Sequence, residues 1–193
     1  MAKLFQQLPS VEAMLAGVFA LAYAYFFVIA RDAMMYSLSL LLLGIFSLKV
    51  MIALFGRLRN VNEYFARVAM VLGVIGTAGM AVHGGYDLAN AINPPTFMSS
   101  DLPSQVDPRG LLSFGFTGVA ILKFSYLMRK DNYFPTNLQF VGAILGTLLI
   151  VIYLARLTVM DPTNPVLLYP VLLNGFILSP LWYFWIGFLF KRK

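Results

Sequence analysis

The chain has 193 residues, of which 60% are hydrophobic and 11% are charged. Soluble domains carry about 25% charged residues, so these side chains are too few to cover a surface that faces water. The 14 Lys and Arg residues are scattered among short connecting segments, which excludes the continuous basic surface that binds nucleic acid. The composition predicts an all-α membrane protein whose main partner is the lipid bilayer, with no nucleic-acid partner.

Six apolar stretches are long enough to cross a membrane, because a spanning helix needs roughly 20 mostly apolar residues. Most connectors are short, but residues 93–110 carry four prolines and two aspartates and predict an irregular outer loop. We expect Ser10 to cap the first helix. The sequence predicts one integral membrane domain over residues 1–193, a bundle of six transmembrane helices with spans at residues 11–30, 36–55, 65–90, 111–128, 138–157 and 166–190.

The basic residues predict how the chain is oriented, because short cytoplasmic loops carry an excess of Lys and Arg. Three of them, Arg31, Arg109 and Arg156, fall on one side of the predicted spans, and nine fall on the other side. This bias predicts cytoplasmic N- and C-termini in a plasma membrane of the bacterial inner-membrane type. The remaining two, Lys49 and Lys123, lie inside spans near the basic side, where we expect their long side chains to snorkel to the membrane surface.

A polar cluster ends the third predicted span. In a helix His83, Asp87 and Asn90 occupy positions i, i+4 and i+7 and share one face, with Tyr86 on the flank. An imidazole one turn from a carboxylate can accept a proton or help to bind a cation. The competing interpretation is structural: at the outer edge of the bilayer polar groups cost little, and the cluster would cap the helix and fix the outer loop.

Other polar side chains share the outer half of the predicted topology with this cluster. Whether they meet it laterally does not follow from the sequence. They are Arg31, Asp32, Ser113, Thr117, Arg156 and Asn174.

Small residues predict how the third span packs. Gly73, Gly76 and Gly79 narrow its middle, and small residues let membrane helices approach closely, so we expect this helix at the centre of the bundle. Residues 17–25 also resemble residues 118–126. The resemblance raises the hypothesis that spans one to three and four to six form an inverted repeat, as in many transporters.

The sequence leaves two functional hypotheses. It has one His, no Cys and none of the common catalytic motifs, so we expect no metal, no cofactor and no catalytic residues, and an enzyme is not favoured. In the first hypothesis a small solute or proton is bound or transported at a polar pocket near the outer face. In the alternative the chain is a structural or accessory subunit that binds another membrane protein or a second copy. The predicted pocket residues are His83, Tyr86, Asp87, Asn90 and Asn174.

Overall fold

The computed structural model of the chain describes residues 2–94, 106–159, 161 and 163–191. The secondary structure of these residues is helical, without a β-strand among them. Six helices in the described part of the chain are long and apolar enough to cross a membrane. The predicted all-α class and the six spans are therefore confirmed, and the architecture is that of a multi-pass membrane protein.

Each span is one continuous run of helix, and three of the six include a π-helical segment, written η. The first span joins α1 to η1, the fourth joins η2 to α4, and the sixth joins α6, η3 and α7. The bounds are α1 Ala2–Ala24, η1 Tyr25–Ala30, α2 Ala33–Leu58, α3 Glu63–Ile92, η2 Leu111–Phe116, α4 Thr117–Met128, α5 Thr136–Arg156, α6 Pro165–Leu173, η3 Asn174–Leu178 and α7 Ser179–Lys191.

Polar residues just before the apolar runs set where several helices begin. The side chains of Asp32, Asn62 and Asn164 each accept a hydrogen bond from a backbone N–H in the first turn of the next helix. Such caps satisfy N–H groups that have no partner within the helix. For this reason α2 and α3 begin two or three residues before the predicted spans.

The predicted cap at Ser10 is wrong. α1 begins at Ala2 and continues through Pro9 and Ser10. The buried Ser10 hydroxyl instead donates a 2.8 Å hydrogen bond to the backbone oxygen of Gly187 in α7. Because Gly187 has no side chain, α1 and α7 approach closely here: an added Cβ would lie 2.8 Å from Met14.

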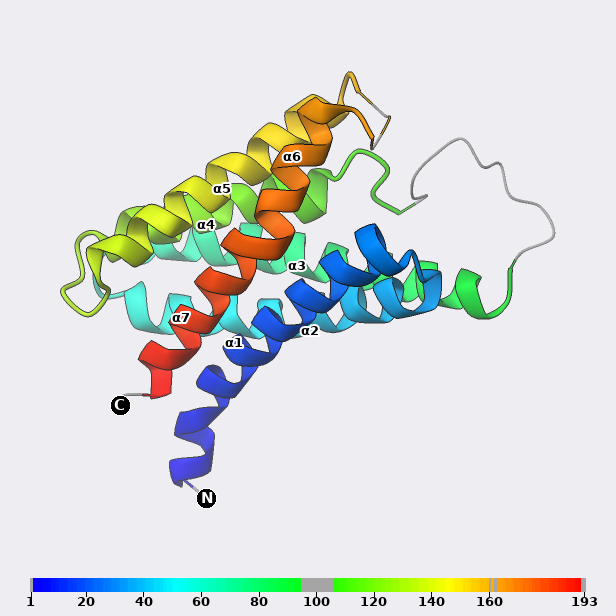
Figure 1. Cartoon of the computed structure of the whole chain (residues 1–193). Helices are drawn as coiled ribbons and strands as arrows, with labels where there is room; N and C mark the ends of the chain where they lie inside the picture. The colour runs from blue at the N-terminus through cyan, green and yellow to red at the C-terminus, as the bar shows by residue number, and fades with distance from the viewer. Residues whose placement is uncertain (1, 95–105, 160, 162, 192–193) are drawn as a thin grey trace.

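The six spans form a closed ring in which each packs on its neighbours in the chain. α1 packs on α2, α2 on α3, α3 on α4, and α4 on α5. The last span closes the ring through the contact of α7 with α1 (Figure 1). In the view of Figure 1 the chain ends N and C lie at one end of the bundle. We call this the terminal end, and the opposite end, which carries residues 31–32 and 157–159, the cavity end.

The prediction that the third span is central is wrong, because α3 occupies one position in the ring, between α2 and the fourth span. Its glycines do serve close packing, as predicted, but on two flanks. A Cβ at Gly73 would lie 2.8 Å from Met51 of α2, and one at Gly79 would lie 2.6 Å from Leu112 of η2. A third flank of α3 carries Val71, Ile75 and Val82, which are 42–60% exposed at the face left for lipid.

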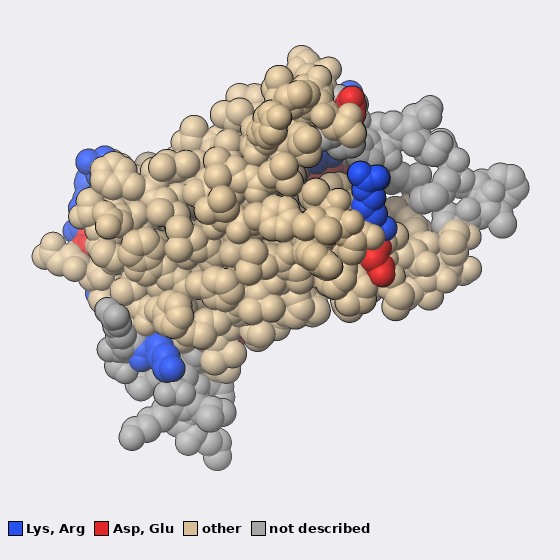
Figure 2. All heavy atoms as spheres, in the orientation of Figure 1, with Lys and Arg blue, Asp and Glu red and all other residues tan. Residues whose placement is uncertain are grey.

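Charged side chains lie near the two ends of the bundle, and a broad uncharged band separates them in the view of Figure 2. Lys49, predicted to snorkel, lies near the terminal end and pairs with Glu12 of α1 at 3.2 Å. Lys123 lies 3.9 Å from the ring centroid of Phe65. A charge inside a membrane protein is tolerated when it is paired or lies near an end of the bundle, and both lysines meet this condition.

Candidate functional site

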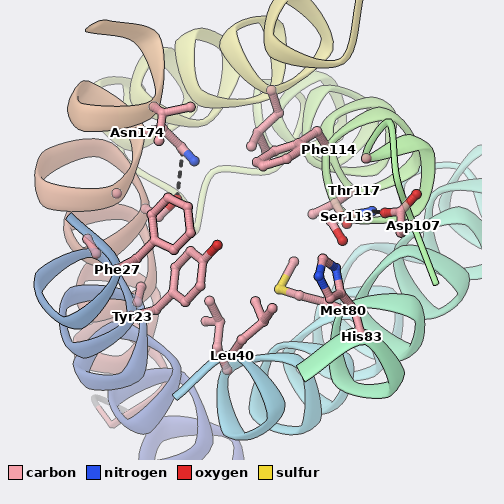
Figure 3. Close-up of a pocket in the computed structure, with 18 of the residues that line it drawn as sticks. Tyr23, Phe27, Leu40, Met80, His83, Asp107, Ser113, Phe114, Thr117 and Asn174 are labelled. Carbon is pink, nitrogen blue, oxygen red and sulfur yellow. Dashed lines mark hydrogen bonds between the residues drawn. The ribbon is translucent and has the colours of Figure 1, made fainter. Parts of the chain in front are cut away.

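The ring encloses a cavity of about 210 Å³ at the cavity end. Residues of all six spans contribute to its wall, together with the described part of the outer loop just before η2 (Figure 3). Most of this wall is apolar, with Phe27, Leu40 and Met80 among the side chains. A few polar groups interrupt it. A mainly apolar pocket with a few convergent polar groups is the usual form of a small-molecule site.

The three π-helical segments meet at this cavity. η1 contributes Phe27, η2 contributes Ser113, and η3 contributes Asn174. In η3 the N–H of Ser179 bonds to the carbonyl of Asn174, immediately before Pro180, which has no N–H of its own. The disturbance of the helix next to Pro180 therefore takes the form of a π-turn. Such turns are rare and are frequent at functional sites, and here three of them surround one space.

His83 lies on the α3 side of the cavity and is held by its neighbour one turn along. Its Nε2 is 3.0 Å from Oδ2 of Asp87, and both side chains are less than one-fifth exposed. The buried Nδ1 has no hydrogen-bond partner among the described residues. With Nε2 committed to the carboxylate, Nδ1 is the atom that can accept a proton or a hydrogen bond from a bound molecule.

Arg156, the last residue of α5, brings a positive charge to the cavity wall. Its guanidinium donates a 3.3 Å hydrogen bond to the backbone oxygen of Pro108 and lies 5.5 Å from the ring centroid of Phe114. Within the described part of the chain no carboxylate lies within 4.0 Å of it. The backbone oxygen of Arg156 accepts a 2.8 Å hydrogen bond from Arg109, which fixes the end of α5.

Asp107 is a buried carboxylate in the cavity wall, but backbone N–H groups already occupy it. Oδ2 accepts a 2.9 Å bond from the N–H of Ser113, and Oδ1 accepts a 3.3 Å bond from the N–H of Leu112. Asp107 thus caps the N-terminal turn of η2, where a negative charge is favourable. The turn between them needs Gly110, whose φ is +76°. The hydroxyl of Ser113 is buried and has no partner among the described residues.

Two more polar groups enter the cavity from the first and the last span. Tyr23 directs its hydroxyl into the space, and Asn174 stands on the opposite wall from His83 (Figure 3). The Asn174 side-chain oxygen accepts a 2.8 Å bond from the Ser179 hydroxyl, so its amide nitrogen remains as a donor. Tyr23 stacks on Phe27 at 5.6 Å between ring centroids.

The structure brings together only part of the predicted pocket. His83 and Asn174 line the cavity. Asp87 is not part of the wall but pairs with His83. Tyr86 and Asn90 are half-buried and are not part of its wall. Of the other outer polar residues, Ser113, Thr117 and Arg156 line it, whereas Arg31 and Asp32 are exposed at the rim of the bundle. Residues 95–105 of the predicted outer loop lie outside the described residues.

Tyr23 and Asp107 were missed as pocket residues. Asp107 had a recognisable signal, because an aspartate followed by Pro, Arg and Gly just before an apolar run is typical of a turn and helix cap. Tyr23 had none: a single tyrosine within an apolar helix gives no indication of the side on which it lies. Among the described residues, no three His, Asp or Glu side chains gather closely enough to hold a metal ion.

Comparison of the chain with models of protein families, with curated protein sequences and with solved structures finds no match in any of the three.

Proposed function

We propose that the protein binds a small solute in the cavity at the cavity end, as a step in carrying or handling that solute at the plasma membrane. The observation that carries the proposal is the position of His83, Arg156 and Asn174, which come from three different spans and line one cavity of about 210 Å³. A merely structural role for the His83 cluster would be served by a filled, dry contact. A cavity beside the imidazole favours binding.

The proposed orientation places the cavity on the outer side, with both chain termini in the cytoplasm. It rests on the excess of Lys and Arg at the terminal end and on the positive-inside rule. A reporter enzyme that is active only in the cytoplasm, fused after Lys193, tests it. The fused cytoplasmic reporter is expected to be active. If a reporter that is active only outside the cell is active when fused at the same position, the proposed orientation is reversed.

Filling the cavity tests the binding role. Val171 lines it from α6, while Leu173, two residues along the same helix, is 42% exposed and lies outside the wall. Val171→Trp should displace the small molecule that copurifies with the protein in mild detergent, detected by native mass spectrometry, and Leu173→Trp should keep it. Equal occupancy in both variants, or no small molecule with any of them, would favour the accessory-subunit role.

A proton belongs to the proposal because His83 lines the cavity and its buried Nδ1 has no hydrogen-bond partner among the described residues. Binding of a solute that bonds to this nitrogen should be accompanied by uptake or release of protons. Calorimetric titration with the solute in two buffers of different ionisation enthalpy measures the number of protons that are taken up or released. His83→Gln should abolish the difference between buffers, and an unchanged difference would remove the imidazole from the mechanism.

A further inference from the structure

Some polar groups of the cavity already bond to other groups of the protein, and others keep free donors. This difference indicates the class of ligand. Both acidic groups beside the cavity are occupied, because Asp107 accepts two backbone N–H bonds and Asp87 pairs with His83. Arg156 has one hydrogen bond to a carbonyl and no described carboxylate within 4.0 Å. Asp107 acts on Arg156 through its charge, but its oxygens already accept backbone N–H bonds. The charged group with donors still free for a ligand is therefore Arg156.

A guanidinium presents five N–H donors in a planar fork that matches a carboxylate or a phosphate. Among the described residues the Arg156 side chain donates one long bond, to Pro108, which leaves most of that fork free. A charge that is half-buried in a mainly apolar wall is costly unless it is paired. An anionic group on the ligand would satisfy this requirement, and the unpartnered Ser113 hydroxyl and the Asn174 amide could bond to its remaining polar atoms.

The rest of the wall fits an apolar body. Tyr23, Phe27, Leu40 and Leu43 face the space from the first and second spans. A cavity of about 150 Å³ lined by apolar side chains holds benzene, so one of about 210 Å³ admits a ring or short chain with an acidic substituent.

The cavity also reaches the surface between the first and the last spans. Phe27 of η1 lines the cavity and is 40% exposed. The first span and α6 diverge toward the cavity end in Figure 1, and the molecule is hollowed on this side in Figure 2, with basic atoms visible in the hollow. The two elements on this side also carry exposed apolar side chains, Ile29 of η1 at 61% and Tyr169 of α6 at 66%. An amphipathic molecule can enter by this route with its apolar part in contact with lipid.

We propose that the cavity binds a small amphipathic carboxylate, whose acidic group pairs with Arg156 and whose apolar body lies against Tyr23 and Phe27. This rests on the proposed function and names its ligand class. The same chemistry is carried by a water-soluble aromatic or short-chain acid and by a fatty acid dissolved in the bilayer.

The test uses the full chain in nanodiscs of zwitterionic lipid, with phenylacetate as the probe and 2-phenylethanol as its neutral counterpart, measured by calorimetry. Phenylacetate should bind at least about tenfold more tightly than the alcohol, and Arg156→Gln should remove that difference, since a hydrogen bond to a charged group contributes about 1.5–3 kcal/mol. Arg31→Gln is the matched control, because it removes a positive charge from the same end outside the cavity wall. Arg156→Lys keeps the charge and should retain part of the preference, and a thermal melt of each variant shows that it is folded.

Competition with oleate and with oleyl alcohol distinguishes the two sources. Displacement of phenylacetate by oleate alone assigns the ligand to the bilayer, and failure of both to displace it assigns a water-soluble acid. Equal binding of phenylacetate to the wild type and to Arg156→Gln, or no binding at all, overturns the inference. Val171→Trp fills the cavity regardless of charge. A copurifying molecule that is lost in Val171→Trp but kept in Arg156→Gln would support the proposed function and contradict the inferred ligand class.

Discussion

The terminal half and the cavity half of the bundle are built from the same six spans, but their interiors differ. In the terminal half large side chains such as Phe124 and Trp182 are fully buried and form one apolar cluster. In the cavity half three of the six spans turn into π-helical segments, and polar side chains surround a space. The comparison teaches that one half supplies the packing that holds the ring together, which leaves the other half free to keep a cavity open.

The two ends of the bundle also differ in the contacts that tie their segments together. At the terminal end Arg57 of α2 pairs with Asp131 at 3.6 Å and lies 4.3 Å from the ring centroid of Tyr133. The Tyr133 hydroxyl in turn donates to the backbone oxygen of Leu189 in α7. These contacts join three parts of the ring. At the cavity end the first span and α6 diverge.

The largest effect is expected from truncating one phenylalanine in each half. Phe124→Ala should lower the free energy of unfolding by about 3–5 kcal/mol, because it opens a new void in a filled core. Phe114→Ala only enlarges a cavity that exists already and should cost below about 2 kcal/mol. Thermal or denaturant unfolding in detergent measures both. Equal losses would mean that the two halves are packed alike.

A second pair of variants sharpens the comparison within the cavity half. A Cβ on Gly84 would overlap the backbone N of Leu41 and lie 2.8 Å from the backbone oxygen of Ser37, whereas at Gly85 the nearest atom is a Leu41 methyl at 3.8 Å. Gly84→Ala should therefore cost about 2–3 kcal/mol by forcing α2 and α3 apart. Gly85→Ala should be neutral or stabilise by up to about 1 kcal/mol. If both are tolerated, the contact of α2 with α3 is looser than the structure has it.

The ion pair at the terminal end should have a smaller effect. Asp131→Ala removes a carboxylate that is 14% exposed and that also accepts a bond from the N–H of Tyr133, and we expect a loss of about 1–2 kcal/mol. Glu63→Ala breaks a pair with Arg67 in which both side chains are 62% exposed, and such pairs contribute about 0.5 kcal/mol or less. Equal melting temperatures for the two variants would show that the half-buried pair of Arg57 with Asp131 does not hold the terminal end.

The smallest effect concerns the connector between α5 and α6 at the cavity end. Hydrogen bonds from the hydroxyl and the backbone N–H of Thr163 lower the pKa of the exposed Asp161 carboxyl. A lowered pKa in the folded state contributes stability above the unfolded pKa and loses it as the pH falls through the folded pKa. Thr163→Ala should raise the pKa of Asp161 toward its usual value, measured by NMR titration. Thr158→Ala, whose hydroxyl bonds elsewhere, should leave it unchanged.

The sequence by itself determined the six crossings and several local contacts. A helix rises 1.5 Å per residue, so the length of an apolar run decides whether it can cross a bilayer, whatever lies beside it. Helical spacing likewise sets the pair of His83 with Asp87, because i and i+4 lie on one face in any helix. The close packing at Gly73 and Gly79 also followed from residue type, since only small residues allow it. The inverted repeat of the two halves stays a prediction.

Only the tertiary structure decided which helices are neighbours and which polar groups share a space. Nearly every face of these spans is apolar, so the sequence holds no strong signal for the lateral order of helices, and the third span was wrongly expected at the centre. The same degeneracy hid the meeting of Tyr23, Arg156 and Asn174, which are far apart in the chain. Their convergence depends on the closed ring and on π-helical turns, whose backbone bonds follow from packing between helices and not from the period of any one of them.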